Sequence, residues 1–263
     1  MPPLTYAIDA PRLGAYADRF VRLDADRDTV AFVESEHRRR HGRLRWAARA
    51  MVRVAVGGFS ANALLDTYPL FMLSEQQWHR LLAPHAHGRL LDVGAAAGHV
   101  TSKLAPLFDD VTATDVSRPM VRRLRARGLR ASVMDLTDGP PAAVLDGGRY
   151  DTVALLNVLD RCARPRTMLR AALDVLAPGG TLVVSMPLPY DPCWYDGPRT
   201  CDPVERLPLR ATHWEPAAEE FARHLEDHGG RVVAMTRAPY LSGGDRHEPL
   251  YVLDAAIVVL AYK

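Results

Sequence analysis

Several residues that could bind a ligand or move a proton lie at the ends of apolar segments in the middle of the chain. The motif Asp92–Gly98 ends an apolar run in a turn of small residues, Gly94–Gly98, and such a turn lets a ligand approach backbone N–H groups at a helix N-terminus. Asp115 closes the next apolar run, about twenty residues on, where a carboxylate can hold a ribose diol. Because the usual middle glycine is missing, an ordinary strand-to-helix turn of an α/β protein is the alternative.

Two further features follow later in the chain. Asp135 comes just after a third apolar run, where its carboxylate could meet an adenine amino group. Leu176–Ser185 reads Leu-Ala-Pro-Gly-Gly-Thr-Leu-Val-Val-Ser. We expect its Pro-Gly-Gly to end a helix and to lead directly into a strand.

The chain around these residues alternates strand-like and helix-like patterns, which predicts a parallel, doubly wound sheet with helices on both faces. Ser74–Leu82 begins with a capping-box pattern and is expected to be the helix before the first strand. We assign residues 1–83 to an N-terminal helical extension packed on the core, and residues 84–263 to the main domain. The Pro-rich interval 187–212 is typical of a lid or binding loop. The expected strands are 89–93, 110–114, 129–133, 150–156, 180–186, 231–237 and 253–261, and the expected helices include 118–127, 166–176 and 216–228.

The overall composition is that of an ordinary globular protein. Of the 263 residues, 48% are hydrophobic and 24% are charged, and the formal net charge is only +2. We therefore expect no nucleic acid partner. Cys162, Cys193 and Cys201 are odd in number and lack metal-type pairing, which favours reduced thiols in a cytoplasmic protein. We expect no secretory signal and no membrane span, since the longest apolar candidate, Trp46–Leu65, contains two arginines and a glycine pair.

A basic stripe is expected near the start of the chain. Arg45, Arg49 and Arg53 are spaced four residues apart, so that on a helix they share one face. Such a face could bind an acidic peptide, nucleic acid or anionic lipid. A solvated helix face, with the arginine stems covering apolar neighbours, is the simpler interpretation.

Taken together, the turn, Asp115, Asp135 and the Pro-Gly-Gly strand resemble the class I S-adenosylmethionine-dependent methyltransferases. The resemblance implies a Rossmann-like α/β fold whose seven-stranded sheet ends with two strands after the last helix. It also implies S-adenosylmethionine as cofactor, with its methionyl part along Gly94–Gly98 and its ribose on Asp115. The cofactor-binding residues that it implies are Asp92, Gly94, Ala95, Gly98, Asp115, Val116, Asp135 and Asn157.

Other segments are less general and resemble one family more closely. From about residue 45 to the end, the chain is similar to the DREV family of protein-histidine N-pros-methyltransferases. This resemblance implies transfer of a methyl group to the pros nitrogen of histidine in peptides or proteins, in His-x-His sequences with a small central residue. The segments that carry it are Leu155–Pro165, Met186–Pro192, His213–Glu215, Thr236–Asp245 and Tyr251–Leu260.

The chemistry of imidazole suggests roles for three residues. Only the nitrogen with a free lone pair can attack a sulfonium methyl, so pros attack needs the proton on the far nitrogen. A carboxylate beside that nitrogen would select this tautomer and stabilise the cation that forms. Asp160, four residues past the expected strand 150–156, is our catalytic candidate, with helix capping as its alternative role. Asn157 could hold the methionyl group or a substrate backbone group. Tyr251 resembles the family tyrosine that contacts the target histidine, and a core aromatic is the alternative.

Some positions depart from the family pattern or leave other functions open. Ala96 and Ala97 replace a second glycine and an acidic residue of the turn, and His99 replaces an acidic neighbour, so cofactor binding is expected but weaker. One alternative is a small-molecule N- or O-methyltransferase in which 187–212 closes over a compact substrate. Another is a non-catalytic binding module. His85–His87 is itself a His-x-His sequence, so a second copy could methylate it, although two exposed loop histidines is the simpler interpretation.

Overall fold

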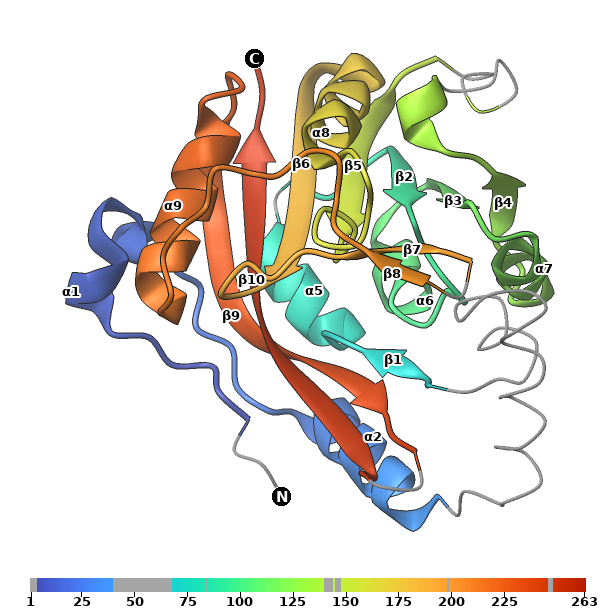
Figure 1. Cartoon of the computed structure of the whole chain (residues 1–263), viewed down its shortest axis with the longest axis horizontal. Coiled ribbons are helices and arrows are strands. Elements are labelled where there is room, and N and C mark those ends of the chain that lie inside the picture. Colours follow the sequence, from blue (N-terminus) through green and yellow to red (C-terminus); the bar gives the residue numbers. More distant parts are fainter. Residues whose placement is uncertain are drawn as a thin grey trace.

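The computed structural model describes residues 4–39, 68–83, 85–139, 144, 148–197, 199–245 and 248–263 (Figure 1). Arg45, Arg49 and Arg53, the predicted basic stripe, lie outside these residues. The main sheet has the order β1-β9-β10-β6-β5-β2-β3-β4. Its strands are β1 (Leu70–Phe71), β2 (Arg89–Val93), β3 (Asp110–Asp115), β4 (Arg130–Val133), β5 (Tyr150–Leu156), β6 (Leu176–Pro187), β9 (Arg231–Gly243) and β10 (Leu250–Ala261).

The central strands form the predicted parallel, doubly wound arrangement. β2 pairs in parallel with β3 and β5, and β5 pairs in parallel with β6. Alternate residues of β2 reach opposite faces: Leu91 packs in one core with α8 (Pro165–Asp174) and α9 (Trp214–Glu226), and Leu90 packs in the other with α5 (Glu75–Leu82). Because helices cover both faces, these strands are nearly continuous apolar runs. The α/β Rossmann-like prediction is confirmed.

The prediction of seven strands is wrong by one, because the described sheet has eight. The two closing strands after the last helix are present as expected, but they run antiparallel, and β9 continues to Gly243, beyond residue 237. Its extended end leaves an edge with which Leu70–Phe71 pairs, and Gly243 N donates to Pro69 O at 2.7 Å. A strand of two residues is too short to produce an alternating pattern.

The helices follow local sequence signals closely, with one exception. At α5 the capping box is complete: Ser74 Oγ accepts from Gln77 N at 3.1 Å, and Gln77 Oε1 accepts from Ser74 N at 2.9 Å. The exception is the predicted helix 166–176. α8 ends at Asp174, and Leu176 already pairs with Tyr150, so Pro-Gly-Gly lies inside β6 and does not end the helix.

The N-terminal residues and the interval 187–212 pack onto this frame. α1 (Ala10–Leu13), the 3-10 helix η1 (Gly14–Arg19) and α2 (Arg27–Arg38) come first, and Val21 N donates to Met235 O of β9 at 2.7 Å. The division at residue 83 stays a prediction. The interval 187–212 contains a small hairpin, β7 (Trp194–Asp196) and β8 (Arg199–Cys201). No helix in the described part of the chain is long and apolar enough to cross a membrane.

Candidate active site

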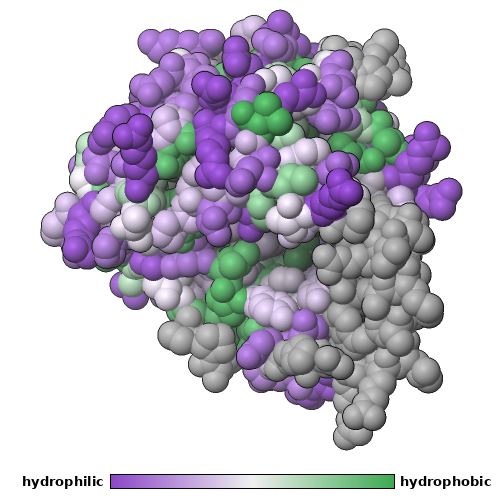
Figure 2. Space-filling model, in the orientation of Figure 1, coloured by the Kyte–Doolittle hydropathy of each residue, from purple (hydrophilic) through white to green (hydrophobic). Residues whose placement is uncertain are grey.

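A cavity of about 890 Å³ opens at the carboxyl ends of the parallel strands. This volume lies in the upper part of the range of ligand pockets, and the place is where open α/β sheets bind ligands. Figure 2 shows apolar surface near the middle of the face on which the molecule is hollowed. The predicted site residues that line the cavity are Asp92, Gly94, Ala95, Asp115, Val116, Asp135, Asn157, Asp160 and Tyr251.

The two glycines of the predicted turn have different surroundings. Gly94 has a φ of 70° and lines the cavity, and a Cβ there would lie 2.7 Å from Val158 Cγ2. Gly98 does not line the cavity; a Cβ there would lie 2.8 Å from Leu124 Cδ2. Gly98 therefore allows the turn to pack closely on α7 (Arg118–Ala126), and its predicted contact with a cofactor has no support from its position.

Backbone groups of neighbouring loops hold the carboxylates of Asp115 and Asp135. Asp115 Oδ2 accepts from Ala96 N at 3.0 Å, and its Oδ1 accepts from Ser117 N at 2.8 Å. Burial raises the pKa of Asp115, although these two bonds oppose the shift. Asp135 Oδ1 accepts from the backbone N and the hydroxyl of Thr137, at 2.9 and 2.7 Å. Both carboxylates are thus fixed in place before any ligand binds.

Asp92 is the most deeply buried carboxylate of the cavity wall, with only 1% of its surface exposed. Its Oδ2 accepts from Thr101 Oγ1 at 2.6 Å, whereas its buried Oδ1 has no hydrogen-bond partner among the residues that the structure describes. Burial raises the pKa of Asp92 to about 7, and the nearby Asp115 contributes to the shift. A buried acceptor without a partner is costly, so Oδ1 is suited to a donor group of a bound ligand.

Asp160 lies in the loop after β5, which forms a second wall of the cavity beside the wall of the turn, and it is 2% exposed. The N-cap position of α8 is Arg164, so Asp160 does not cap that helix. Its Oδ2 forms an ion pair with Arg161 Nη1 at 3.0 Å, and its buried Oδ1 has no hydrogen-bond partner in the described part of the chain. Burial raises the pKa of Asp160 to about 6, and Arg161 reduces the shift. Cys193 N donates to Asp160 O at 3.0 Å, which attaches the 187–212 interval to this loop.

Asn157 and Tyr240 adjoin Asp160 in the cavity wall. Asn157 has a φ of 55°, and its Oδ1 accepts from Ser185 Oγ at 2.8 Å, which joins β5 to β6. Tyr240 of β9 also lines the cavity. Burial and the Asp160 carboxylate raise the pKa of Tyr240, and the nearby side chain of Asn157 opposes the shift. Tyr240 was not predicted from the sequence, although it lies within the segment Thr236–Asp245.

Tyr251 lies at the mouth of the cavity and not in the core. It is the second residue of β10, it is 38% exposed, and its hydroxyl donates to Asp245 Oδ2 at 2.9 Å. Its ring centroid is 6.5 Å from that of Tyr68. The alternative of a core aromatic is therefore wrong, and an accessible ring at the mouth could contact a substrate.

The His85–His87 sequence lies far from these groups along the fold. It precedes β2, at the amino edge of the parallel strands, and neither histidine lines the cavity. His85 is partly buried, and its backbone N bonds to Leu82 O. Burial lowers the pKa of His85, and so do Arg231 and His87. Methylation of these histidines in the same molecule is thereby excluded, and methylation by a second copy stays a prediction.

Parts of the chain are similar to known proteins in sequence or in structure. The ubiquinone biosynthesis O-methyltransferases of Xanthomonas oryzae pv. oryzae (strain PXO99A) and Xanthomonas campestris pv. campestris (strain B100) are 32% identical over 103 and 100 residues. These matches cover 38% and 37% of this chain, which spans less than half of the relatives, 43% and 42% of their lengths. The N-methyltransferase NodS from Bradyrhizobium japonicum WM9, solved with S-adenosyl-L-homocysteine, is 18% identical with a TM-score of 0.46, covering 72% of this chain and 85% of NodS.

A second solved structure, the DhpI-SAH complex, is 19% identical with a TM-score of 0.47 and covers 82% of this chain and 96% of DhpI. A family model, in contrast, matches the chain over the whole cavity. The family model described as DREV methyltransferase matches residues 6–262, and this range includes every residue that lines the cavity. The chain therefore belongs to the DREV methyltransferase family.

Proposed function

We propose that this methyltransferase transfers the methyl group of S-adenosylmethionine to the pros nitrogen of histidine in peptides or proteins, with His-x-His sequences as targets. Asp115 would hold the ribose of the donor, and Asp135 its adenine amino group. The residues of the site fit S-adenosylmethionine, because small residues expose the backbone of the turn and because hydrogen bonds from backbone N–H groups already fix both carboxylates. The bound donor supplies a sulfonium methyl group, which needs alignment more than it needs acid–base chemistry.

The single observation that carries the histidine assignment is the Oδ1 of Asp160, which is buried in the cavity wall and has no hydrogen-bond partner among the described residues. A neutral imidazole that donates its N–H to Oδ1 keeps the lone pair on its other nitrogen. That lone pair forms the new N–C bond, and the electron pair of the broken S–C bond stays on sulfur. The positive charge then lies on the methylated imidazole beside the Asp160 carboxylate, which stabilises it.

The mouth of the cavity supports a polypeptide substrate. Tyr195, Tyr251 and Leu253 line the cavity and are 37%, 38% and 39% exposed. Accessible aromatic rings at an opening provide contact area for an imidazole and for the chain on either side of it. Such a mouth admits a side chain carried on an extended segment.

A methyl-transfer assay on the peptide Ala-His-Ala-His tests the proposal, with Ala-Gln-Ala-Gln, free histidine and imidazole as controls. We expect a gain of one methyl mass on the His peptide alone. Acid hydrolysis and chromatography against both methylhistidine isomers should then identify the pros isomer. Transfer to free histidine or imidazole without transfer to the peptide would contradict the proposal.

One alternative has an observation in its favour, since the curated relatives that match part of the chain are named O-methyltransferases. A catechol included in the same assay distinguishes this alternative: methyl transfer to the phenol and not to the peptide would establish a small-molecule enzyme. Donor binding without transfer to any acceptor would support the third possibility, a non-catalytic binding module.

A further inference from the structure

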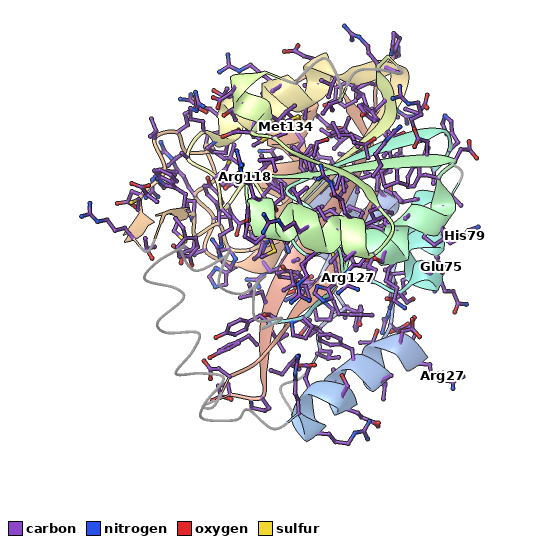
Figure 3. All side chains as sticks on the ribbon, turned by 90° about the vertical axis from the view of Figure 1, so that its right-hand side faces the viewer. Arg27, Glu75, His79, Arg118, Arg127 and Met134 are labelled. Atoms are coloured by element: carbon purple, nitrogen blue, oxygen red, sulfur yellow. The ribbon has the colours of Figure 1, made fainter. Side chains whose placement is uncertain are left out.

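The helix α7 and the residues after it carry an unusual concentration of positive charge. The segment 117–134 contains six arginines and no acidic residue, whereas the whole chain has a net charge of only +2. The apolar residues Met120, Val121 and Leu124 are buried, so the arginines occupy the outer side of the helix. Figure 3 shows α7 with Arg118 and Arg127 at its two ends.

Four of these six arginines interact with other groups of the protein. Arg125 donates to Ala131 O, Arg127 donates to Ala97 O, and Arg130 pairs with Asp110. Arg123 also has an interaction. Arg118 and Arg122 are exposed, and in the described part of the chain neither forms an ion pair or a side-chain hydrogen bond.

Nothing in the helix itself favours these two charges. Arg118 and Arg122 are four residues apart on one face, where like charges cost about 0.2–0.5 kcal/mol. Arg118 is also at the N-terminal end of the helix, where the helix dipole disfavours a cation. Both costs would be removed by an anionic group bound to this face.

The two arginines lie close to the cavity in the fold. Val116, one residue before the cap of α7, and Met120, in its first turn, both line the cavity. An extended polypeptide whose side chain enters the cavity can therefore pass over the first turns of α7.

We propose that Arg118 and Arg122 bind an acidic segment of the polypeptide substrate, adjacent to the residue that enters the cavity. This inference rests on the proposed polypeptide acceptor. The two arginines are about 6 Å apart along the helix, which matches two residues of an extended chain. A nucleic acid or an anionic membrane is a poorer match, because such partners are bound by larger sets of about four to ten basic groups.

The test compares peptides that carry the same Ala-His-Ala-His core and either three Glu or three Gln residues on one side. For the unaltered enzyme we expect a KM lower by about five- to tenfold for the Glu peptide, with the advantage decreasing as salt is added. The double variant R118E/R122E should lose this advantage and keep its kcat and its KM for the Gln peptide. Glu at the first turn suits the helix dipole, so α7 should still form.

The matched control is R27E/R80E, which makes the same change of charge at two exposed arginines of α2 and α5. This control should keep the preference for Glu. Equal KM values for the two peptides with the unaltered enzyme, or an undiminished preference in R118E/R122E, would overturn the proposal. The proposal would also be overturned if R118E/R122E lost binding to a single-stranded oligonucleotide or to anionic vesicles but still bound the Glu peptide as the unaltered enzyme does.

Fluorescence anisotropy with a labelled Glu peptide that lacks histidine separates this proposal from the proposed function. If no peptide is methylated but this probe binds the unaltered enzyme and not R118E/R122E, the histidine assignment fails and the docking face stands. If peptides are methylated and the probe binds both proteins equally, the docking face fails and the histidine assignment stands.

Discussion

The two walls of the cavity satisfy their polar groups in different ways. On the wall of the turn, Asp115 and Asp135 already accept hydrogen bonds from backbone N–H groups. On the second wall, Asp160 is more deeply buried than these two carboxylates, and one of its oxygens has no hydrogen-bond partner among the described residues. Apart from Asp92 Oδ1, which also lacks a partner among the described residues, the carboxylates of the first wall are held before any ligand binds, whereas the carboxylate of the second wall is completed by the group that enters it. Mutations on the two walls should therefore affect different quantities, donor affinity on one side and turnover on the other.

The largest expected effect is that of Asp160→Asn on turnover. The amide cannot stabilise the imidazolium as a carboxylate does, and we expect kcat to fall by at least about 100-fold. The Kd for S-adenosylmethionine, measured by calorimetry, should change less than about threefold. A variant with unaltered kcat would show that Asp160 has no role at the acceptor, and equal losses of turnover and donor affinity would show that the two walls are not separate.

The same substitution should stabilise the fold at high pH. Burial raises the pKa of Asp160 from 3.8 to about 6, so the folded state binds a proton that the unfolded state releases between these values. The stability contributed by this group is present at low pH and is lost as the pH rises through 6. At pH 8 the charged form costs on the order of 3 kcal/mol. Thermal unfolding should find Asp160→Asn more stable than the original at pH 8, with a smaller difference at pH 4.5. The same difference at both values would contradict this account.

On the wall of the turn, Asp115→Ala should weaken donor binding by about tenfold or more, because it removes a charged hydrogen-bonding group at the ribose site. With saturating donor, kcat should fall much less than in Asp160→Asn. Asp110→Ala is a matched control on the same strand, since Asp110 forms partly exposed ion pairs with Arg89 and Arg130. Should Asp115→Ala lower kcat at saturating donor while leaving the donor Kd unchanged, the proposed division of roles would be wrong.

Local sequence patterns predicted one wall of the cavity better than the other. The strands 89–93 and 150–156 have the bounds of β2 and β5, because runs that are buried on both faces have sharp ends. The carboxylates that follow such strands meet at one edge of a parallel sheet, so Asp115 and Asp160 could be placed from order alone. Tyr240 could not, because its position depends on the antiparallel pairing of β9 with β10, in which it lies opposite Leu253.

Contacts with residues distant in the sequence also give two glycines of the same motif different roles. Gly94 and Gly98 both belong to the predicted turn, but Leu124 of α7 faces Gly98 and Val158 of the loop after β5 faces Gly94. Whether a glycine serves a ligand or the packing of a helix depends on such contacts. A single sequence carries no record of them.

Tyr240→Phe should have an intermediate effect on the acceptor wall. Because burial raises its pKa, the hydroxyl stays protonated near neutral pH and acts as a hydrogen-bond donor and not as a base. We expect kcat/KM for the peptide to fall about three- to tenfold, which corresponds to one hydrogen bond. Tyr262→Phe is the control, since Tyr262 is also partly buried with a raised pKa but does not line the cavity. Equal activities of the two variants would exclude Tyr240 from the site.

The smallest effect tests whether the two alanines weaken the turn. Ala96 has a φ of 49°, a left-handed conformation in which alanine is strained and glycine is not. Ala96→Gly should therefore raise the free energy of unfolding by about 0.5–1 kcal/mol. Ala97 is the matched control: it is not among the described residues with positive φ, so Ala97→Gly should lower stability by a similar amount. Because Ala96 N already bonds to Asp115, donor affinity should change little, and a large gain in affinity with Ala96→Gly would show that this wall is not preformed.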